Sequence, residues 1–317
     1  MRKPSERLLI TMNIIYKKLA LLSILLFAIT TVKTYGQVLP DLSSVRSVMK
    51  VPALSFGKPK AGARVKQTTQ GWENTNVYHV LYLPRDWKPG KKYPVIVEFA
   101  GNGNYRNKYG DVSNGSVEGS SLGYGLSKGK EFIWICMPFI DVKGSSKVNA
   151  ITWWGDVEET KKYIYATLDM IGKTYGADLN CTILAGFSRG SIACNYLGLN
   201  DDRIAQVWKA FFCHSHYDGV NEKWPYPFAD RKSALQRLQR LEERPQWISQ
   251  EGSTKNIRKY LDSTGVKGQF TFQDIPYRNH SDTWLLKNTA ESKAARLWLR
   301  KVVRLAPPNI TSVSIQK

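Results

Sequence analysis

The stretch that decides the fold is residues 182–193, which read TILAGFSRGSIA. The first half is β-branched and apolar, as in a buried strand, and the second half has small and apolar residues at helical spacing. A sharp turn between the two would raise the Ser188 side chain out of the backbone. The chain would then pass so close to itself at Gly186 and Gly190 that a Cβ atom would clash.

Gly186, Ser188 and Gly190 form a GxSxG pattern. The pattern alone is short, but a strand before it and a helix after it are the context of a nucleophile elbow. The sequence therefore predicts that Ser188 is a nucleophile. A bland glycine-rich turn is the alternative.

Residues 1–36 have the pattern of a signal peptide. Lys17 and Lys18 precede the apolar run 19–32, and small residues stand three and one positions before Gln37. We expect an exported protein, periplasmic or extracellular, with no stable membrane span after processing. An uncleaved N-terminal anchor is the alternative.

Composition excludes some classes of function. The formal charge is +20, and it falls to +15 when six basic residues and one acidic residue leave with residues 1–36. This excess favours anionic partners, but the basic residues are spread along the chain without the signature of a nucleic-acid-binding fold. We therefore expect a solvated basic surface and no nucleic acid. The four cysteines show no CxxC spacing, so buried free thiols are expected and one disulfide stays open.

Short β-rich runs alternate with amphipathic helical stretches from residue 77 onward, which is typical of a mostly parallel sheet covered by helices. Strands are expected at 77–83, 93–100, 132–140, 181–187, 207–213, 245–250 and 270–275, and helices at 156–173, 231–243, 253–263 and 290–304. Asp156 and Glu159 form a capping box at the first of these helices. Residues 73–317 are expected to be one catalytic domain, and 37–72 an N-terminal extension with one strand.

With its elbow in this order of elements, the chain resembles the α/β-hydrolase fold. It is more loosely similar to secreted esterases of the polyhydroxybutyrate depolymerase, feruloyl esterase and dienelactone-hydrolase-like types. The resemblance covers about residues 75–304. It implies a mostly parallel central sheet flanked by helices on both faces in a single domain, no cofactor, and a catalytic triad in the chain order serine, acid, histidine.

The resemblance places the general base just after the last strand, where His280 stands before the closing helix. The acid has two candidates. The usual family position, three residues beyond a glycine that follows the later strand, is occupied here by Lys255. Some members carry the acid after the preceding strand, so Asp218 is preferred and Glu251 is the alternative.

The resemblance also implies an oxyanion hole made of two backbone amides. Arg189, directly after the nucleophile, supplies one amide. The other is expected from Asn102 or Gly103, in the glycine-bearing loop after the strand at 93–100, with an ordinary turn as the alternative.

His214, His216 and Asp218 spell HxHxD, a pattern that also occurs in metal sites. In an extended strand the three side chains would share one face and could bind zinc. In the metallo-β-lactamase-like signature the motif continues with a further histidine, but this chain has Gly219 at that position. Few other histidines remain to complete a zinc site. No metal is therefore expected.

Aromatic residues gather in the loops that would border the site. Trp153, Trp154 and Trp284 are expected to contact substrate, and flat rings suit sugars or aromatic acyl groups. The sequence therefore predicts a serine esterase acting on a small-molecule or polysaccharide-linked ester. The alternatives are a serine peptidase of the same fold and a catalytically inactive glycan-binding protein.

Overall fold

The computed structural model describes residues 38–304. The chain divides into two compact units, Met1–Leu39 and Pro40–Lys317, and every element below lies in the second. The expected signal peptide falls outside the described residues. Between residues 38 and 304, no helix is long and apolar enough to cross a membrane.

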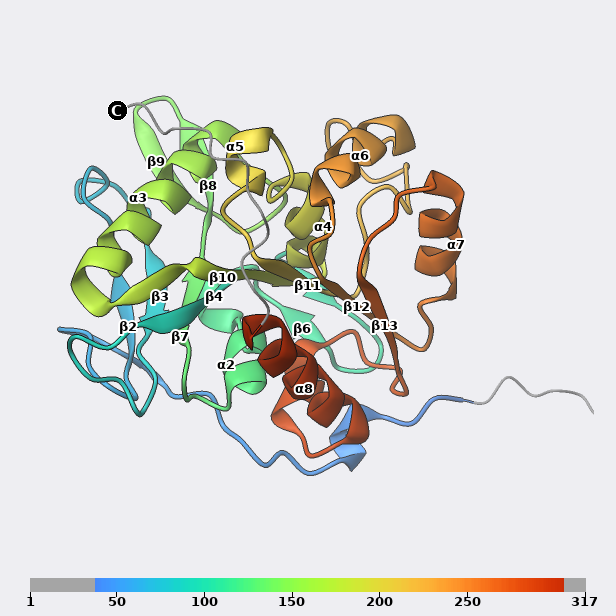
Figure 1. Cartoon of the computed structure of the whole chain (residues 1–317), viewed down its shortest axis with the longest axis horizontal. Coiled ribbons are helices and arrows are strands. Elements are labelled where there is room, and N and C mark those ends of the chain that lie inside the picture. The colour runs from blue at the N-terminus through green and yellow to red at the C-terminus, as the bar shows by residue number, and fades with distance from the viewer. Residues whose placement is uncertain (1–37, 305–317) are drawn as a thin grey trace, which may run out of the picture. The chain divides into compact units, whose positions relative to one another are not determined.

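A nine-stranded sheet forms the centre of this unit (Figure 1). In spatial order its strands are β1 (Leu54–Ser55), β2 (Arg64–Gln67), β3 (His79–Tyr82), β7 (Ile133–Met137), β4 (Tyr93–Phe99), β10 (Ala177–Phe187), β11 (Ala210–His214), β12 (Gln246–Glu251) and β13 (Phe270–Ile275). Only β3 runs antiparallel to its two neighbours. From β7 to β13 all neighbours are parallel, so the carboxyl ends of these strands share one edge.

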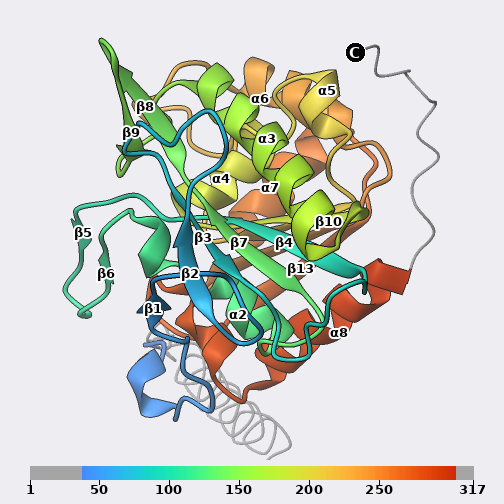
Figure 2. The ribbon, with the colours of Figure 1, turned by 90° about the vertical axis from the view of Figure 1, so that its left-hand side faces the viewer.

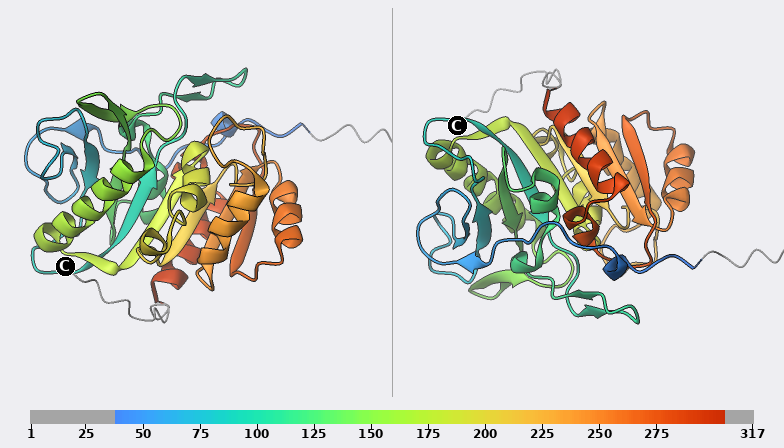
Figure 3. Two further views of the ribbon diagram at one scale, coloured as in Figure 1. Left: turned by 90° about the horizontal axis from the view of Figure 1, so that it is seen from above. Right: turned by 90° about the horizontal axis from the view of Figure 1, so that it is seen from below.

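Helices cover both faces of the sheet (Figures 1 and 3). The helices are α2 (Leu122–Ser127), α3 (Val157–Tyr175), α4 (Arg189–Tyr196), α5 (Asp202–Ala205), α6 (Arg231–Leu238), α7 (Lys255–Thr264) and α8 (Ala290–Arg304), with short 3₁₀ turns at Leu42–Ser44, Val117–Gly119, Gln239–Leu241 and Asp282–Leu286. Strand β4 shows why the strands are almost wholly apolar. Val95 and Val97 pack in the cluster on the side of α3, α4 and α7, whereas Ile96 packs in the cluster with α2 and α8. Both faces are buried, so the sequence shows no polar alternation.

Two hairpins project from the carboxyl edge of the sheet. They are β5 (Tyr105–Arg106) with β6 (Val112–Ser113), and β8 (Phe139–Lys143) with β9 (Ser146–Ala150). Figure 2 shows both standing away from the sheet. The strand expected at 132–140 is therefore two strands, since the chain leaves the sheet after Met137 and enters a hairpin.

The expected extension at 37–72 is partly built into the sheet. Strand β2 pairs antiparallel with β3, and β1 pairs parallel with β2. At α3, Asp156 caps the helix by accepting from the Glu159 amide at 2.8 Å. The Glu159 carboxylate instead accepts from Trp72 and Lys147, so the reciprocal half of the expected capping box is not formed. All four cysteines are buried free thiols.

Candidate active site

The turn between β10 and α4 carries Ser188 in a strained backbone conformation, with φ 55° and ψ −113°. A Cβ on Gly186 would lie 2.1 Å from the Gly190 carbonyl group, and one on Gly190 would lie 1.9 Å from the Phe99 oxygen. The expected steric reason for both glycines is confirmed. The Ser188 amide donates to the His214 carbonyl on the neighbouring strand, which helps to hold the strained residue.

His280 lies in the loop after β13 and faces Ser188. Its Nε2 atom is 2.9 Å from Ser188 Oγ, and its Nδ1 atom is 2.7 Å from Glu251 Oε1. Ser188 is 7% exposed. The three side chains therefore form one continuous chain of hydrogen bonds from hydroxyl to carboxylate, in the order that general base catalysis by a serine hydroxyl requires.

The preferred acid, Asp218, is not part of this chain. Its carboxylate is 1% exposed and accepts two hydrogen bonds from Arg237, at 2.8 and 3.1 Å, and one from Tyr226 at 3.1 Å. These contacts make it one half of a buried structural ion pair. The choice of Asp218 over Glu251 is therefore corrected, because Glu251 contacts His280 and Asp218 pairs with Arg237 instead.

Sheet order explains the correction. His280 follows β13, whose neighbour is β12, and Glu251 is the last residue of β12. Asp218 lies four residues beyond β11, one strand further away. Ser215 and His216, which lie between the end of β11 and Asp218, both have positive φ, 63° and 83°. The chain therefore turns before it reaches Asp218. The position of Glu251 at a strand end, beside the strand that leads to His280, was the signal in the sequence that could have identified it.

Ser215 is a site residue that the sequence did not single out. It is fully buried, and its hydroxyl lies 2.5 Å from Glu251 Oε2 and 2.9 Å from His280 Nδ1. The hydroxyl donates to Oε2, which leaves Oε1 for the imidazole. Burial alone would raise the pKa of Glu251, but hydrogen bonds from His280 and Ser215 and the charge of His280 lower it to about 2. Glu251 is therefore ionised at neutral pH.

A backbone amide can donate to an oxyanion only if it does not already donate to another carbonyl group. Arg189 is the first residue of α4, so its amide has no acceptor within the helix and lies beside Ser188. The Gly103 amide donates to the Ile151 carbonyl at 2.7 Å. That bond removes Gly103 as a donor to substrate, which leaves Gly101 or the expected Asn102 for the second amide. Asn102 is held by its own side chain, which accepts from the Trp153 amide at 2.8 Å.

The Arg189 side chain is 1% exposed and ties the loops of the site together. The guanidinium donates to four carbonyl oxygens, those of Ala100, Gly115, Ala150 and Trp153, at 2.7 to 3.4 Å. It also lies over the Phe139 ring, 4.2 Å from its centroid. The loop after β4 and the segment before α3 are therefore both anchored to the elbow.

Only one of the three expected substrate-contacting tryptophans is accessible. Trp154 is 4% exposed and stacks on Tyr196, and Trp284 is fully buried, donating through Nε1 to His214. Both belong to the core, so their expected role at the site is corrected. Trp153 is half-buried and contacts the rings of Trp224 and Tyr226.

The HxHxD residues point to different neighbours rather than to one centre. His214 is buried between Ser249 and Trp284, and His216 packs on Trp224 and His280. Asp218 pairs with Arg237. Within residues 38–304, no group of three or more His, Cys, Asp or Glu side chains is arranged to hold a metal ion.

The β5–β6 hairpin is a second feature that the sequence did not reveal. Asp111, in its turn, accepts from the His280 amide at 2.8 Å and from the Asn279 side chain at 2.9 Å. The Tyr105 ring lies 5.0 Å from the His280 ring. The hairpin therefore holds the loop that carries His280.

The mostly parallel sheet, the helices on both faces and the serine at a strand-to-helix elbow together define the α/β-hydrolase fold. Solved structures similar to this chain include a thermostable esterase, with 16% identity, TM-score 0.42, and coverage of 75% of this chain and 62% of that one. An S-formylglutathione hydrolase from Agrobacterium tumefaciens has 13% identity, TM-score 0.49 and coverage of 75% and 92%. The acylaminoacyl peptidase of Pyrococcus horikoshii has 13% identity, TM-score 0.48 and coverage of 80% and 43%.

This chain thus spans less than two thirds of the length of the esterase and of the peptidase. At these identities and TM-scores the likeness concerns the fold and says nothing of the reaction. Neither a scan of protein-family models nor a search of curated proteins finds a match.

Proposed function

We propose that the protein is an exported serine hydrolase that cleaves carboxylic esters through an acyl-enzyme on Ser188. One observation carries the proposal, the hydrogen-bonded chain from Ser188 Oγ through both nitrogens of His280 to Glu251. An ionised carboxylate at its end favours the imidazolium that forms during the reaction.

In the acylation step, Ser188 Oγ attacks the ester carbonyl carbon while His280 Nε2 takes the hydroxyl proton. The bond from carbon to the alcohol oxygen then breaks, and His280 returns the proton to that oxygen. In deacylation a water molecule attacks the acyl carbon while His280 takes its proton. The bond from carbon to Ser188 Oγ then breaks, and His280 returns the proton to that oxygen, which releases the acid. Glu251 holds the imidazole orientation throughout and stays ionised.

The negative charge on the carbonyl oxygen needs two donors that do not move during the reaction. The Arg189 amide meets this requirement because it is fixed by α4, and an amide of Gly101 or Asn102 is the second donor. The buried Arg189 guanidinium supports both, since it binds the Ala100 carbonyl beside Gly101.

The aromatic residues Trp153 and Trp224 support a sugar or an aromatic group as part of the substrate, because flat rings stack on such groups. The apolar run and small residues before Gln37 support export. N-terminal sequencing of protein recovered outside the cytoplasm should begin at Gln37, and an intact N-terminus there would overturn the processing step.

A fluorophosphonate probe followed by peptide mapping tests the nucleophile. We expect the adduct on Ser188, and we expect Ser188→Ala to lower turnover of 4-nitrophenyl acetate by roughly 10³-fold or more. Ser263→Ala, a hydroxyl on α7, is the matched control and should retain turnover. An adduct elsewhere, or activity that survives Ser188→Ala and is lost with a chelator, would overturn the mechanism.

The same assay separates an esterase from a peptidase. Matched 4-nitrophenyl esters and 4-nitroanilides of one acyl group differ only in the leaving atom. Rapid turnover of the ester alone supports the proposal. Comparable rates on the anilides would favour a peptidase.

A further inference from the structure

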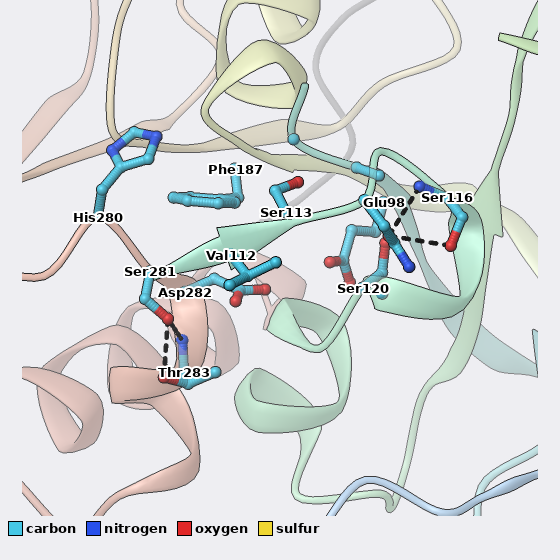
Figure 4. Close-up of a pocket in the computed structure, with 14 residues that line it drawn as sticks. Glu98, Val112, Ser113, Ser116, Ser120, Phe187, His280, Ser281, Asp282 and Thr283 are labelled. Carbon is cyan, nitrogen blue, oxygen red and sulfur yellow. Dashed lines mark hydrogen bonds between the residues drawn. The ribbon is translucent and has the colours of Figure 1, made fainter. Parts of the chain in front are cut away.

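A pocket of about 210 Å³ opens beside His280. It is bounded by Gly101 of the oxyanion loop and Phe187 of the elbow on one side, and by Ser120 and Asp282 on another. Figure 4 shows His280 and Phe187 above Asp282 and Ser120 in the view. Since the pocket touches both the base and the oxyanion loop, a group attached to an ester bound at Ser188 can enter it. This volume suits only a small group.

Among the described residues, the walls of the pocket contain two carboxyl groups, several hydroxyls that can donate or accept, and no Lys or Arg. The Glu98 carboxyl group accepts three hydrogen bonds, from the amides of Leu122 and Gly123 and from Trp134 Nε1. Asp282 accepts from the Ser121 hydroxyl at 3.0 Å and also interacts with the backbone amides of Ser121 and of Asp282 itself. A carboxylate-lined pocket without a cation disfavours an anionic group and favours a donor.

Ser120 gives independent evidence for a ligand. It is 5% exposed and lines the pocket, and its hydroxyl has no nitrogen or oxygen partner within the described residues. Its hydroxyl does interact with the Cys136 sulfur, but sulfur is a weak acceptor. The backbone here is fixed, since Arg64 donates to the carbonyls of Ser120, Glu118 and Val117. A buried hydroxyl whose partner is only a weak sulfur acceptor is poorly compensated for its loss of water, and a ligand in the pocket would supply a stronger partner.

The ionisation of the two carboxyl groups is consistent with this role. Burial and the nearby charge of Asp282 raise the pKa of Glu98 to about 7. Burial raises the pKa of Asp282 to about 6. The pair therefore carries less than two full negative charges at neutral pH. A hydroxyl or an ammonium group entering the pocket would find both an acceptor and a favourable charge.

We propose that this pocket selects esters whose small group beside the scissile bond carries a hydrogen-bond donor, with Ser120 and Asp282 as the residues that bind it. This inference rests on the proposed ester hydrolysis at Ser188. The shared chemistry is the donor, which a hydroxyl or an ammonium group can supply.

Matched substrates test the selection. On the acyl side, ethyl isobutyrate, ethyl lactate and alanine ethyl ester differ only in methyl, hydroxyl and ammonium. On the alcohol side, butyl acetate is compared with 3-hydroxypropyl acetate. Monoethyl malonate supplies an anionic group. On either the acyl side or the alcohol side, we expect kcat/KM to be at least about 10-fold higher for the donor-bearing ester than for its methyl counterpart. Of all these esters, monoethyl malonate should have the lowest kcat/KM.

Two variants connect the selection to the pocket. Ser120→Ala removes a hydroxyl whose partner is a weak sulfur acceptor, so the variant should fold. Asp282→Asn keeps the shape while removing the charge. Each should reduce the ratio of kcat/KM between the matched esters to within about threefold. Ser263→Ala should leave the ratio as in the wild type.

The possible outcomes distinguish failure of the pocket's proposed role from failure of ester hydrolysis at Ser188. Equal rates on matched esters, or a preference that survives both variants, would overturn the pocket's role and leave ester hydrolysis intact. No hydrolysis of any ester, with no probe adduct on Ser188, would overturn the proposed function and this inference with it. A preference for the ammonium ester alone, or for the hydroxyl esters alone, would identify the donor.

Discussion

The Ser215 hydroxyl lies 2.5 Å from Glu251 Oε2 and donates a hydrogen bond to it. Ser215→Ala removes this bond from a buried carboxylate, and a hydrogen bond to a charged group contributes about 1.5–3 kcal/mol. We expect kcat to fall by roughly 10- to 100-fold with little change in KM, because the lost bond positions His280 rather than substrate. Steady-state kinetics across pH measures this effect. An unchanged kcat and pH profile would limit Ser215 to a structural role.

Glu251 and Asp218 should respond in opposite ways to loss of charge. Glu251→Gln should lower kcat by roughly 10³- to 10⁴-fold while the protein stays folded, because the imidazolium loses its partner. Asp218→Asn should retain kcat per folded molecule but lose about 3–5 kcal/mol of stability, since it leaves Arg237 buried without its counter-ion.

Activity and urea unfolding, measured on both variants, give the comparison. Turnover abolished by Asp218→Asn in a fully folded sample would restore Asp218 as the triad acid.

The pair Glu98 and Asp282 should make stability depend on pH. Their pKa values in the folded protein, about 7 and about 6, lie above their ordinary values. The unfolded chain therefore binds fewer of these protons between about pH 4 and pH 7, so their contribution to stability is present at low pH and is lost as pH rises through this window. Asp282→Asn should reduce that loss.

The difference between the wild-type and Asp282→Asn unfolding free energies, followed from pH 4 to pH 8, measures this effect. Burial lowers the pKa of His214 and of His216 to about 4, which acts in the opposite direction but equally in both proteins. Asp262→Asn, an exposed carboxylate on α7, is the control. A difference that does not vary with pH would contradict the coupling.

Asp111 should affect the reaction from outside the triad. Asp111→Ala frees the His280 amide and the Asn279 side chain, so the loop carrying the base loses its anchor to the β5–β6 hairpin. We expect kcat/KM to fall by roughly 10-fold, in line with the loss of hydrogen bonds to a carboxylate. Asp86→Ala, which removes a similar bond to the Glu131 amide far from the site, should not lower it.

The fold was predictable from the sequence because the elements that determine it are local and strongly patterned. The apolar strands and the two elbow glycines can each be recognised from a few neighbouring residues. The prediction of an α/β-hydrolase fold is confirmed. His280 was found for a similar reason, since few histidines exist and only this one follows the last strand. Export and the substrate stay predictions.

The acid was misjudged because its identity depends on a non-local relation. Asp218 and Glu251 both follow strands, and what separates them is which strand lies beside β13 and which way the chain turns after β11. The turn at Ser215 and His216 uses positive φ without glycine, so the sequence gives no sign of it. The buried positions of Trp154 and Trp284 were missed because an aromatic residue in a loop can pack inward.

The guanidinium of Arg189 has a consequence for how this site could change. Its carbonyl partners lie in three separate segments, while its own amide stands beside the nucleophile. A loop graft that alters substrate preference must keep those carbonyl oxygens in place, or the disturbance reaches the amide itself. New specificity should therefore be obtained more easily by replacing side chains within these loops than by changing their length.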